Sequence, residues 1–261
     1  MKELDPSTPI YRYMDLPELF SILVNGELFF CRSNCLPDNN ECNLSNDDKI
    51  KLKNDFVQYF PSDRLEENFE KLVNDIESER NKVFISSWSF NKDDYALWKI
   101  YTDNSRFGVC VETTVQEINK VIKINSGYFM RGKAVEYSSR DFTDLMEFIK
   151  MKDAKSMLNE MINLLVFHKS EHYIYENEFR IVAFNENNSN QQGISFSFDI
   201  SSFIKRVHIS PLMPEWFLYV LMQLGGMSIG GDSQIDRMRL EMFKPLLVLK
   251  YSSINDKTKK S

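Results

Sequence analysis

The segment "HYIYENEFRIVAF", residues His172–Phe184, alternates between polar and apolar side chains in the manner of a β-strand. In a strand, side chains two residues apart point to the same face. Glu176, Glu178 and Arg180 are therefore expected on one face, while Phe179, Ile181 and Ala183 point to the other. Two like charges side by side repel each other and raise a carboxyl pKa. The close spacing of the two glutamates therefore indicates either a functional role or nearby positive charges that compensate their repulsion.

The composition indicates a folded protein with a substantial core. Of 261 residues, 43% are hydrophobic and 13% aromatic, and the formal net charge is −6. This acidic balance argues against a protein that mainly binds nucleic acid non-specifically, which needs an excess of cations. We expect one domain over residues 1–261, with a charged helical insertion at about 45–80 and a flexible tail at about 253–261.

The chain shows no signal for secretion or membrane insertion. Its first residues lack the apolar core of a signal peptide, and the apolar run Trp216–Met222 is too short to span a bilayer. Four cysteines without a secretory signal predict free thiols in a reducing compartment. We therefore expect a cytoplasmic bacterial protein with no membrane partner.

Hydrophobic periodicity predicts strands interleaved with helices. The first helix is expected over Pro17–Val24, with Asp15 as its cap and Asn25-Gly26 as its end. A long helix is expected over Asp141–Lys169. Together these elements predict an α+β protein with a mainly antiparallel sheet, continuous or split, and flanking helices. Strands are expected at Ile10–Asp15, Leu28–Cys31, "KVFISSWSF", "FGVCVE", "GYFMRGKAVEYS", "GISFSFDI" and "IKRVHIS".

Three separated strand segments carry polar side chains suited to one reaction. Arg12 lies in the first strand, Ser87 and Ser89 flank a tryptophan in a middle strand, and Glu176 and Glu178 lie in a late one. An arginine, a Ser-x-Ser and a Glu-x-Glu in this order resemble the Arg–Ser–Glu branch of the ADP-ribosyltransferase superfamily. That superfamily binds NAD in a cleft between two small sheets.

This resemblance implies roles for single residues and NAD as a substrate. Glu178 would be the catalytic glutamate, because a carboxylate stabilises the oxocarbenium character that develops when the nicotinamide–ribose bond breaks. Glu176 would face the acceptor nucleophile. Arg12 would bind the pyrophosphate, which matches the fork of a guanidinium. The residues expected to bind NAD are Arg12, Tyr13, Ser87, Trp88, Ser89 and Tyr101, the aromatic ones by stacking on the nicotinamide.

A second resemblance covers residues 10–210. The segments "YRYMD", "SSWSFNKDDYALWKIY" and "KSEHYIYENEFRIV" are similar to the bacterial domain-of-unknown-function family 2971 (DUF2971). This resemblance lies in the set and order of the segments. The family name implies no activity.

Two functions from different classes are consistent with these patterns. The first is an ADP-ribosyltransferase-like enzyme, a bacterial toxin or phage-defence effector, that modifies a macromolecule or hydrolyses NAD. Nucleic acid would then enter only as an acceptor. The second is a non-catalytic module of the same fold, whose charged helical insertion binds a protein partner.

Each motif also has an ordinary structural interpretation. Glu176, Glu178 and Arg180 fit the solvated face of an edge strand, and a surface arginine gains little from pairing with an acid. His168 and His172 are spaced like metal ligands, but they lack a third ligand and fit a helix C-terminus better. We expect no metal site.

Overall fold

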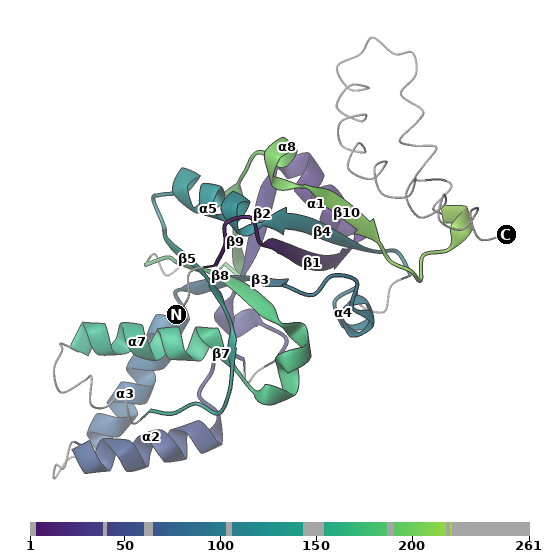
Figure 1. Cartoon of the computed structure of the whole chain (residues 1–261). Coiled ribbons are helices and arrows are strands. Elements are labelled where there is room, and N and C mark those ends of the chain that lie inside the picture. The colour runs from purple at the N-terminus through teal and green to yellow at the C-terminus, as the bar shows by residue number, and fades with distance from the viewer. Residues whose placement is uncertain are drawn as a thin grey trace. The chain divides into compact units, whose positions relative to one another are not determined.

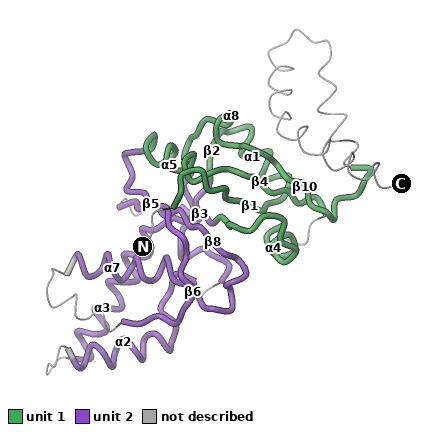
Figure 2. The backbone as a smooth tube through the Cα atoms, in the orientation of Figure 1, with its two compact units in different colours: residues 1–28, 88–125, 196–261 green, residues 29–87, 126–195 purple. Residues whose placement is uncertain are grey.

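The computed structural model divides into two compact units, each assembled from separate chain segments (Figures 1 and 2). Unit 1 contains residues 1–28, 88–125 and 196–261, and unit 2 contains residues 29–87 and 126–195. The structure describes residues 4–38, 41–59, 65–102, 106–142, 154–186, 191–217 and 220. The single domain expected from the sequence stays a prediction, and the expected tail at 253–261 lies outside the described residues.

In unit 1, strand β4 (Gly108–Thr114) lies between β1 (Pro9–Asp15) and β10 (Arg206–Ile209). Both neighbours run antiparallel to β4, and Tyr13 lies opposite Cys110. Both faces of β1 and β4 are largely buried, and Tyr11, Tyr13 and Cys110 pack with helix α4 (Tyr95–Ile100) on one of them. The buried apolar side chains of this sheet include Ile10, Met14, Val109, Val111 and Val207.

The helices of unit 1 begin and end at residues that satisfy their free backbone groups. Helix α1 (Leu16–Asn25) starts after Asp15, whose carboxylate accepts a hydrogen bond from the Glu18 N–H at 2.8 Å. It ends at Gly26, where φ is +64°, a left-handed conformation that glycine adopts without strain. The expected cap and end of this helix are confirmed. Further helices that the structure describes in this unit include α4, α5 (Val115–Ile124) and α8 (Ile200–Phe203).

Unit 2 contains the strands that carry the paired glutamates. Strand β8 (Glu178–Phe184) pairs with β3 (Val83–Ser89) and runs antiparallel to β5 (Phe129–Ala134). β3 also runs antiparallel to β2 (Glu27–Arg32). β8 is thus an interior strand. The remaining strands among the described residues are β9 (Gly193–Ser197) and the short parallel pair β6 (Glu136–Tyr137) and β7 (His168–Lys169). The 3₁₀ helices described here are η1 (Ser33–Cys35) and η2 (Glu171–Glu176).

Three helices form the core of unit 2 together with β3 and β8. They are α2 (Asn46–Tyr59), α3 (Leu65–Arg80) and α7 (Ala154–Phe167). α2 and α3 lie where the sequence predicts charged helices, and α3 buries one apolar face, as its periodicity predicts. The buried members of this cluster include Leu52, Phe69, Leu72, Ile76, Met161, Leu165, Val166 and Val182.

Mixed helices and a mainly antiparallel sheet confirm the predicted α+β class. The expected strand through Glu176 is wrong, because residues up to Glu176 form η2 and β8 begins only at Glu178. Asn177 separates the two elements with a φ of +44°, a left-handed conformation that asparagine tolerates better than most residues. The expected helix over 141–169 corresponds to α7, which ends at Phe167, and residues 143–153 lie outside the described part of the chain. The helices that the structure describes are all too short or too polar to cross a membrane.

The cap of α4 provides a test of how this short helix is stabilised. Asp94 accepts hydrogen bonds from the N–H groups of Ala96 at 2.8 Å and Leu97 at 3.2 Å. We expect Asp94→Ala to lower the free energy of unfolding by about 1 kcal/mol, because two N–H groups lose their acceptor. Urea denaturation measures this loss. Asp94→Asn keeps a capping oxygen and should stay closer to wild type, and equal stability of the two variants would contradict the capping role.

Candidate functional site

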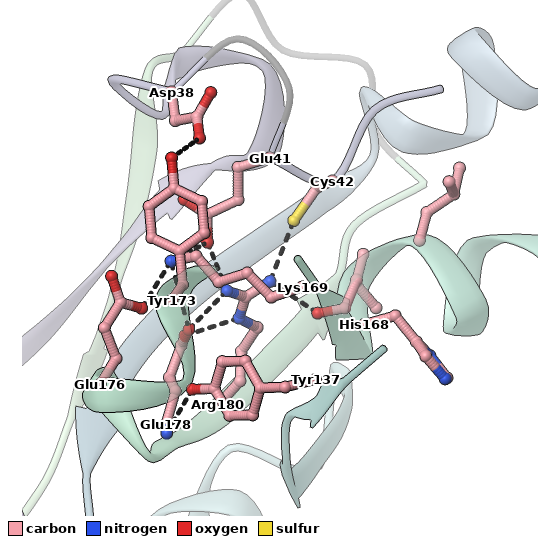
Figure 3. A network of polar contacts seen from close by, with 12 residues as sticks. Asp38, Glu41, Cys42, Tyr137, His168, Lys169, Tyr173, Glu176, Glu178 and Arg180 are labelled. Carbon is pink, nitrogen blue, oxygen red and sulfur yellow. Dashed lines mark hydrogen bonds and ion pairs between the residues drawn. The ribbon is translucent and has the colours of Figure 1, made fainter. Parts of the chain in front are cut away.

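Arg180 lies at the centre of a buried polar network in unit 2 (Figure 3). Its side chain is 0% exposed. Nε and Nη2 donate to the two carboxylate oxygens of Glu178, each at 2.7 Å, and Nη1 donates to the Val166 carbonyl at 2.6 Å and to Cys42 Sγ at 3.1 Å. Nη2 also donates to Glu41. One guanidinium therefore joins β8, the end of α7 and the loop that contains Glu41 and Cys42.

The position of β8 explains why Glu178 and Arg180 are buried. The two residues share a face of the strand, as the alternation predicts, and both faces of β8 are buried. The end of α7 and the loop of Glu41 and Cys42 contact the face that carries Arg180. Glu178 is only 4% exposed. The alternative of a solvated edge strand is therefore wrong. Planar, bidentate pairing of arginine with carboxylate is a geometry that lysine cannot provide.

Lys169 joins Glu176 to the same network. Its Nζ lies 2.6 Å from Glu176, 3.3 Å from Glu41 and 3.8 Å from Glu178. It also lies 4.6 Å from the centre of the Tyr173 ring, in cation–π contact. Burial by itself lowers the pKa of Lys169, but the charges of Glu41, Glu178 and Glu176 outweigh this effect and raise its pKa above the ordinary value. The side chain is thus held as an ammonium ion.

The cations of the network explain how Glu176 and Glu178 can lie close together. Burial raises the pKa of Glu178, yet the charge and hydrogen bonds of Arg180, with further help from Lys169, lower its pKa below the usual value. Three carboxylates (Glu41, Glu176 and Glu178) face two cations, so the network keeps one negative charge in excess. The repulsion between the glutamates is therefore compensated by cations rather than by protonation.

Two hydroxyl groups contact Glu178 from other elements. The Glu178 N–H donates to the Tyr137 hydroxyl at 2.8 Å, and burial raises the pKa of Tyr137 to about 12. A hydrogen bond from the Ser87 side chain also lowers the pKa of Glu178. Ser87 is exposed, unlike its neighbours in β3. It therefore connects the buried carboxylate with solvent.

Cys42 and Glu41 were not identified from the sequence. Cys42 is fully buried, with a φ of +54°, and burial raises the pKa of its thiol to about 11. Both residues lie in an irregular loop, and Arg180 lies 139 positions from Glu41. No local pattern indicates such a contact. For Lys169 the only signal is a lysine seven positions before Glu176, which periodicity does not distinguish from a surface residue.

A cavity of about 430 Å³ adjoins the network within unit 2. Glu41, Lys169 and Tyr173 belong both to its wall and to the contacts described above. The Tyr173 hydroxyl donates to Asp38 at 2.9 Å (Figure 3). Both residues line the cavity. The buried ion pairs thus form one side of a polar hollow.

The remaining predicted NAD-binding residues lie in unit 1. Arg12 is half-buried on β1, and Tyr101 follows α4 with its side chain 42% exposed. Tyr13 is buried and donates from its hydroxyl to the Asn91 carbonyl at 2.8 Å. Trp88 packs on Phe203, and the buried Ser89 accepts a hydrogen bond from the Asn91 N–H at 2.9 Å. Their convergence with Glu178, like their binding of NAD, stays a prediction.

The histidines near the network have protein partners. His168 follows α7 directly, and its Nε2 lies 3.1 Å from Glu136. Burial lowers the pKa of His168 below its usual value. His172 contacts the Ser170 hydroxyl at 2.9 Å. Within the described part of the chain, no group of three His, Cys, Asp or Glu side chains has the geometry of a metal site.

Comparison with known proteins identifies one family and one solved structure. Residues 97–181 match the model of DUF2971, described as a protein of unknown function. The predicted resemblance to this family is confirmed over that range, which is shorter than the expected 10–210 and includes Lys169, Glu178 and Arg180 but neither Glu41 nor Ser87. The chain is also similar to DarT from Thermus sp. 2.9, solved in complex with ADP-ribosylated single-stranded DNA, with 15% identity and a TM-score of 0.34 over 85% of this chain and 92% of that one. This degree of similarity assigns neither fold nor activity. A comparison with curated protein sequences finds no match.

The depressed pKa of Glu178 makes stability depend on pH. The pKa of this carboxyl is lower in the folded chain than in the unfolded one, so its contribution is complete above the unfolded value of 4.5 and is lost as pH falls through the folded value. We expect the free energy of unfolding to fall as the pH drops below about 4.5. This fall should be smaller in Glu178→Gln, which cannot take up that proton.

Urea denaturation at a series of pH values measures this difference. Glu70→Gln, at an exposed position of α3, removes the same charge and should follow the wild-type curve. If the free energy of unfolding falls equally with decreasing pH in wild type and in Glu178→Gln, the Glu178 carboxyl is not held ionised by its partners.

Proposed function

We propose that this protein cleaves the nicotinamide–ribose bond of NAD, and that Glu178 supports the reaction. The ADP-ribose would pass to a macromolecular acceptor or to water, in a cytoplasmic toxin or phage-defence effector. The observation that carries the proposal is the buried, ionised Glu178 on β8 beside β3, the strand on which Ser87 is exposed. An ionised carboxylate and a solvent-reachable hydroxyl, on adjacent strands, are the groups that a ribose ring needs for binding and for charge stabilisation.

The charge of the network suits this chemistry. When the C1′–N bond breaks, its electron pair leaves with nicotinamide and positive charge develops on the ribose. The acceptor then forms a new bond to C1′ and releases its proton. The excess negative charge shared by Glu41, Glu176 and Glu178 would stabilise the cationic ribose, because charges interact strongly where water is excluded. In this scheme Glu176 orients the acceptor.

A second candidate function is a non-catalytic module that binds a protein partner. The observation that favours it is the bidentate pairing of Glu178, in which both carboxylate oxygens accept from Arg180 at 2.7 Å. Such pairing gives the glutamate a purely structural role. In this alternative the charged helices α2 and α3 carry the binding surface.

Release of nicotinamide distinguishes the two functions. Pure protein is incubated with NAD, with and without cell lysate as a source of acceptors, and free nicotinamide is measured by chromatography. We expect release by wild type and none above background by Glu178→Gln. Ser87→Ala should lower kcat about 10- to 100-fold, because it removes one charge-assisted hydrogen bond from the carboxylate.

Controls separate chemistry from folding. Ser126→Ala changes another exposed serine of unit 2 and should keep wild-type kcat. Circular dichroism identifies any variant that fails to fold, and Ser87→Ala remains informative because its site is exposed. Absence of release by folded wild type in both conditions would favour the binding module. Equal release by Glu178→Gln would remove Glu178 from the reaction.

A further inference from the structure

The cavity of unit 2 has the size of a small-molecule site. Its volume of about 430 Å³ falls in the range of about 300–1,000 Å³ that is typical of ligand pockets. Three chain segments line it: the loop and first turn of α2, a short stretch after β6, and the segment from β7 into η2. A single inorganic ion would leave most of this space unfilled.

Charge in the wall favours a cationic ligand. Five carboxylates line the cavity, against three lysine or arginine side chains. The two cations that lie deepest already have anionic partners. Arg140 pairs with Asp48 at 2.8 Å and donates to the Asn43 carbonyl at 2.5 Å, and Lys169 pairs with the glutamates of the buried network.

Two carboxylates in the wall are available to a ligand. Among the residues that the structure describes, none forms an ion pair or hydrogen bond with the side chains of Asp47 or Glu171, which are both exposed. The same holds for Lys51, the third cation of the wall, whose long side chain is exposed to water. An anion entering here would meet an excess of negative charge, which is unfavourable.

Hydrogen-bonding groups in the cavity wall also favour a cationic ligand. The Tyr173 hydroxyl holds the Asp38 carboxylate in the wall, with 2.9 Å between the two oxygens. Hydroxyls of Ser138, Ser139 and Ser170 also line the space and can accept from an ammonium group. The Tyr173 ring already contacts one ammonium, that of Lys169. A metal ion fits less well, because the described residues offer no group of three metal ligands.

We propose that this cavity binds a small organic cation with ammonium groups, of the alkyl polyamine class. One ammonium lies against Asp38 and the serine hydroxyls, and a second lies toward Asp47 and Glu171 at the exposed rim. Glu41 and Lys169 belong both to this cavity and to the network proposed for NAD cleavage. The binding test does not need enzymatic activity, so its outcome does not depend on that of the NAD assay.

Isothermal titration calorimetry of the full-length protein with spermidine tests the proposal. We expect saturable one-site binding that weakens as salt rises, since exposed charges are screened. Asp47→Asn combined with Glu171→Gln should weaken binding about 10-fold, because each exposed carboxylate contributes a few-fold. Neither substitution touches the buried network, so the variant should keep the wild-type melting temperature.

Matched controls distinguish a site from general attraction to an acidic protein. Glu67→Gln combined with Glu70→Gln removes two exposed charges of α3 in the same unit and should leave spermidine affinity unchanged. Magnesium chloride and inorganic phosphate, titrated at matched ionic strength, should give no saturable heat. The proposal is overturned by absent spermidine binding, by tighter binding of magnesium or phosphate, or by equal weakening in the α3 control.

Discussion

The burial of the Arg180 guanidinium is the constraint on which unit 2 depends. Moving an arginine out of water costs several kcal/mol unless every donor finds a well-placed acceptor. Arg180 meets this condition with Glu178 on its own strand, the Val166 carbonyl in α7, and Cys42 and Glu41 in the loop after η1. The strand, the helix and the loop must all be in place for the guanidinium to be fully hydrogen-bonded. The cost of burying an unpaired Arg180 therefore favours the one arrangement in which these three segments contact it.

The same network also places ionised carboxylates beside the cavity of unit 2. Lys169 extends it to Glu176 and to the cavity wall, so ionised carboxylates lie beside a polar hollow without being protonated. Ser87, the exposed residue of β3, contributes a hydrogen bond to Glu178. A buried ion-pair network of this kind serves equally as a rigid support and as a source of negative potential. The geometry is therefore compatible with both an NAD-cleaving enzyme and a non-catalytic binding module. Only a measurement of catalytic activity distinguishes the two functions.

Local sequence rules predict the parts of this arrangement that depend on neighbours in the chain. The cap at Asp15, the end at Gly26 and the shared face of Glu178 and Arg180 follow from short-range patterns. The left-handed Asn177 does not, because the alternation that follows it favours a strand more strongly than a single asparagine favours a turn. Glu41 could not be predicted either, since it reaches Arg180 across 139 positions from an irregular loop. Whether Glu178 faced water or the core depended on the packing of α7 and the loop of Cys42 against β8, which the sequence of β8 alone does not indicate.

A double-mutant cycle between Glu178 and Arg180 tests the central claim most directly. Wild type, Glu178→Gln, Arg180→Met and the double variant are unfolded with urea at neutral pH, and the four free energies of unfolding are compared. If the buried pair holds unit 2 together, each single change costs about 3 kcal/mol or more, and the double costs less than their sum by at least about 1.5 kcal/mol. Additive losses, with a coupling free energy near zero, would contradict it.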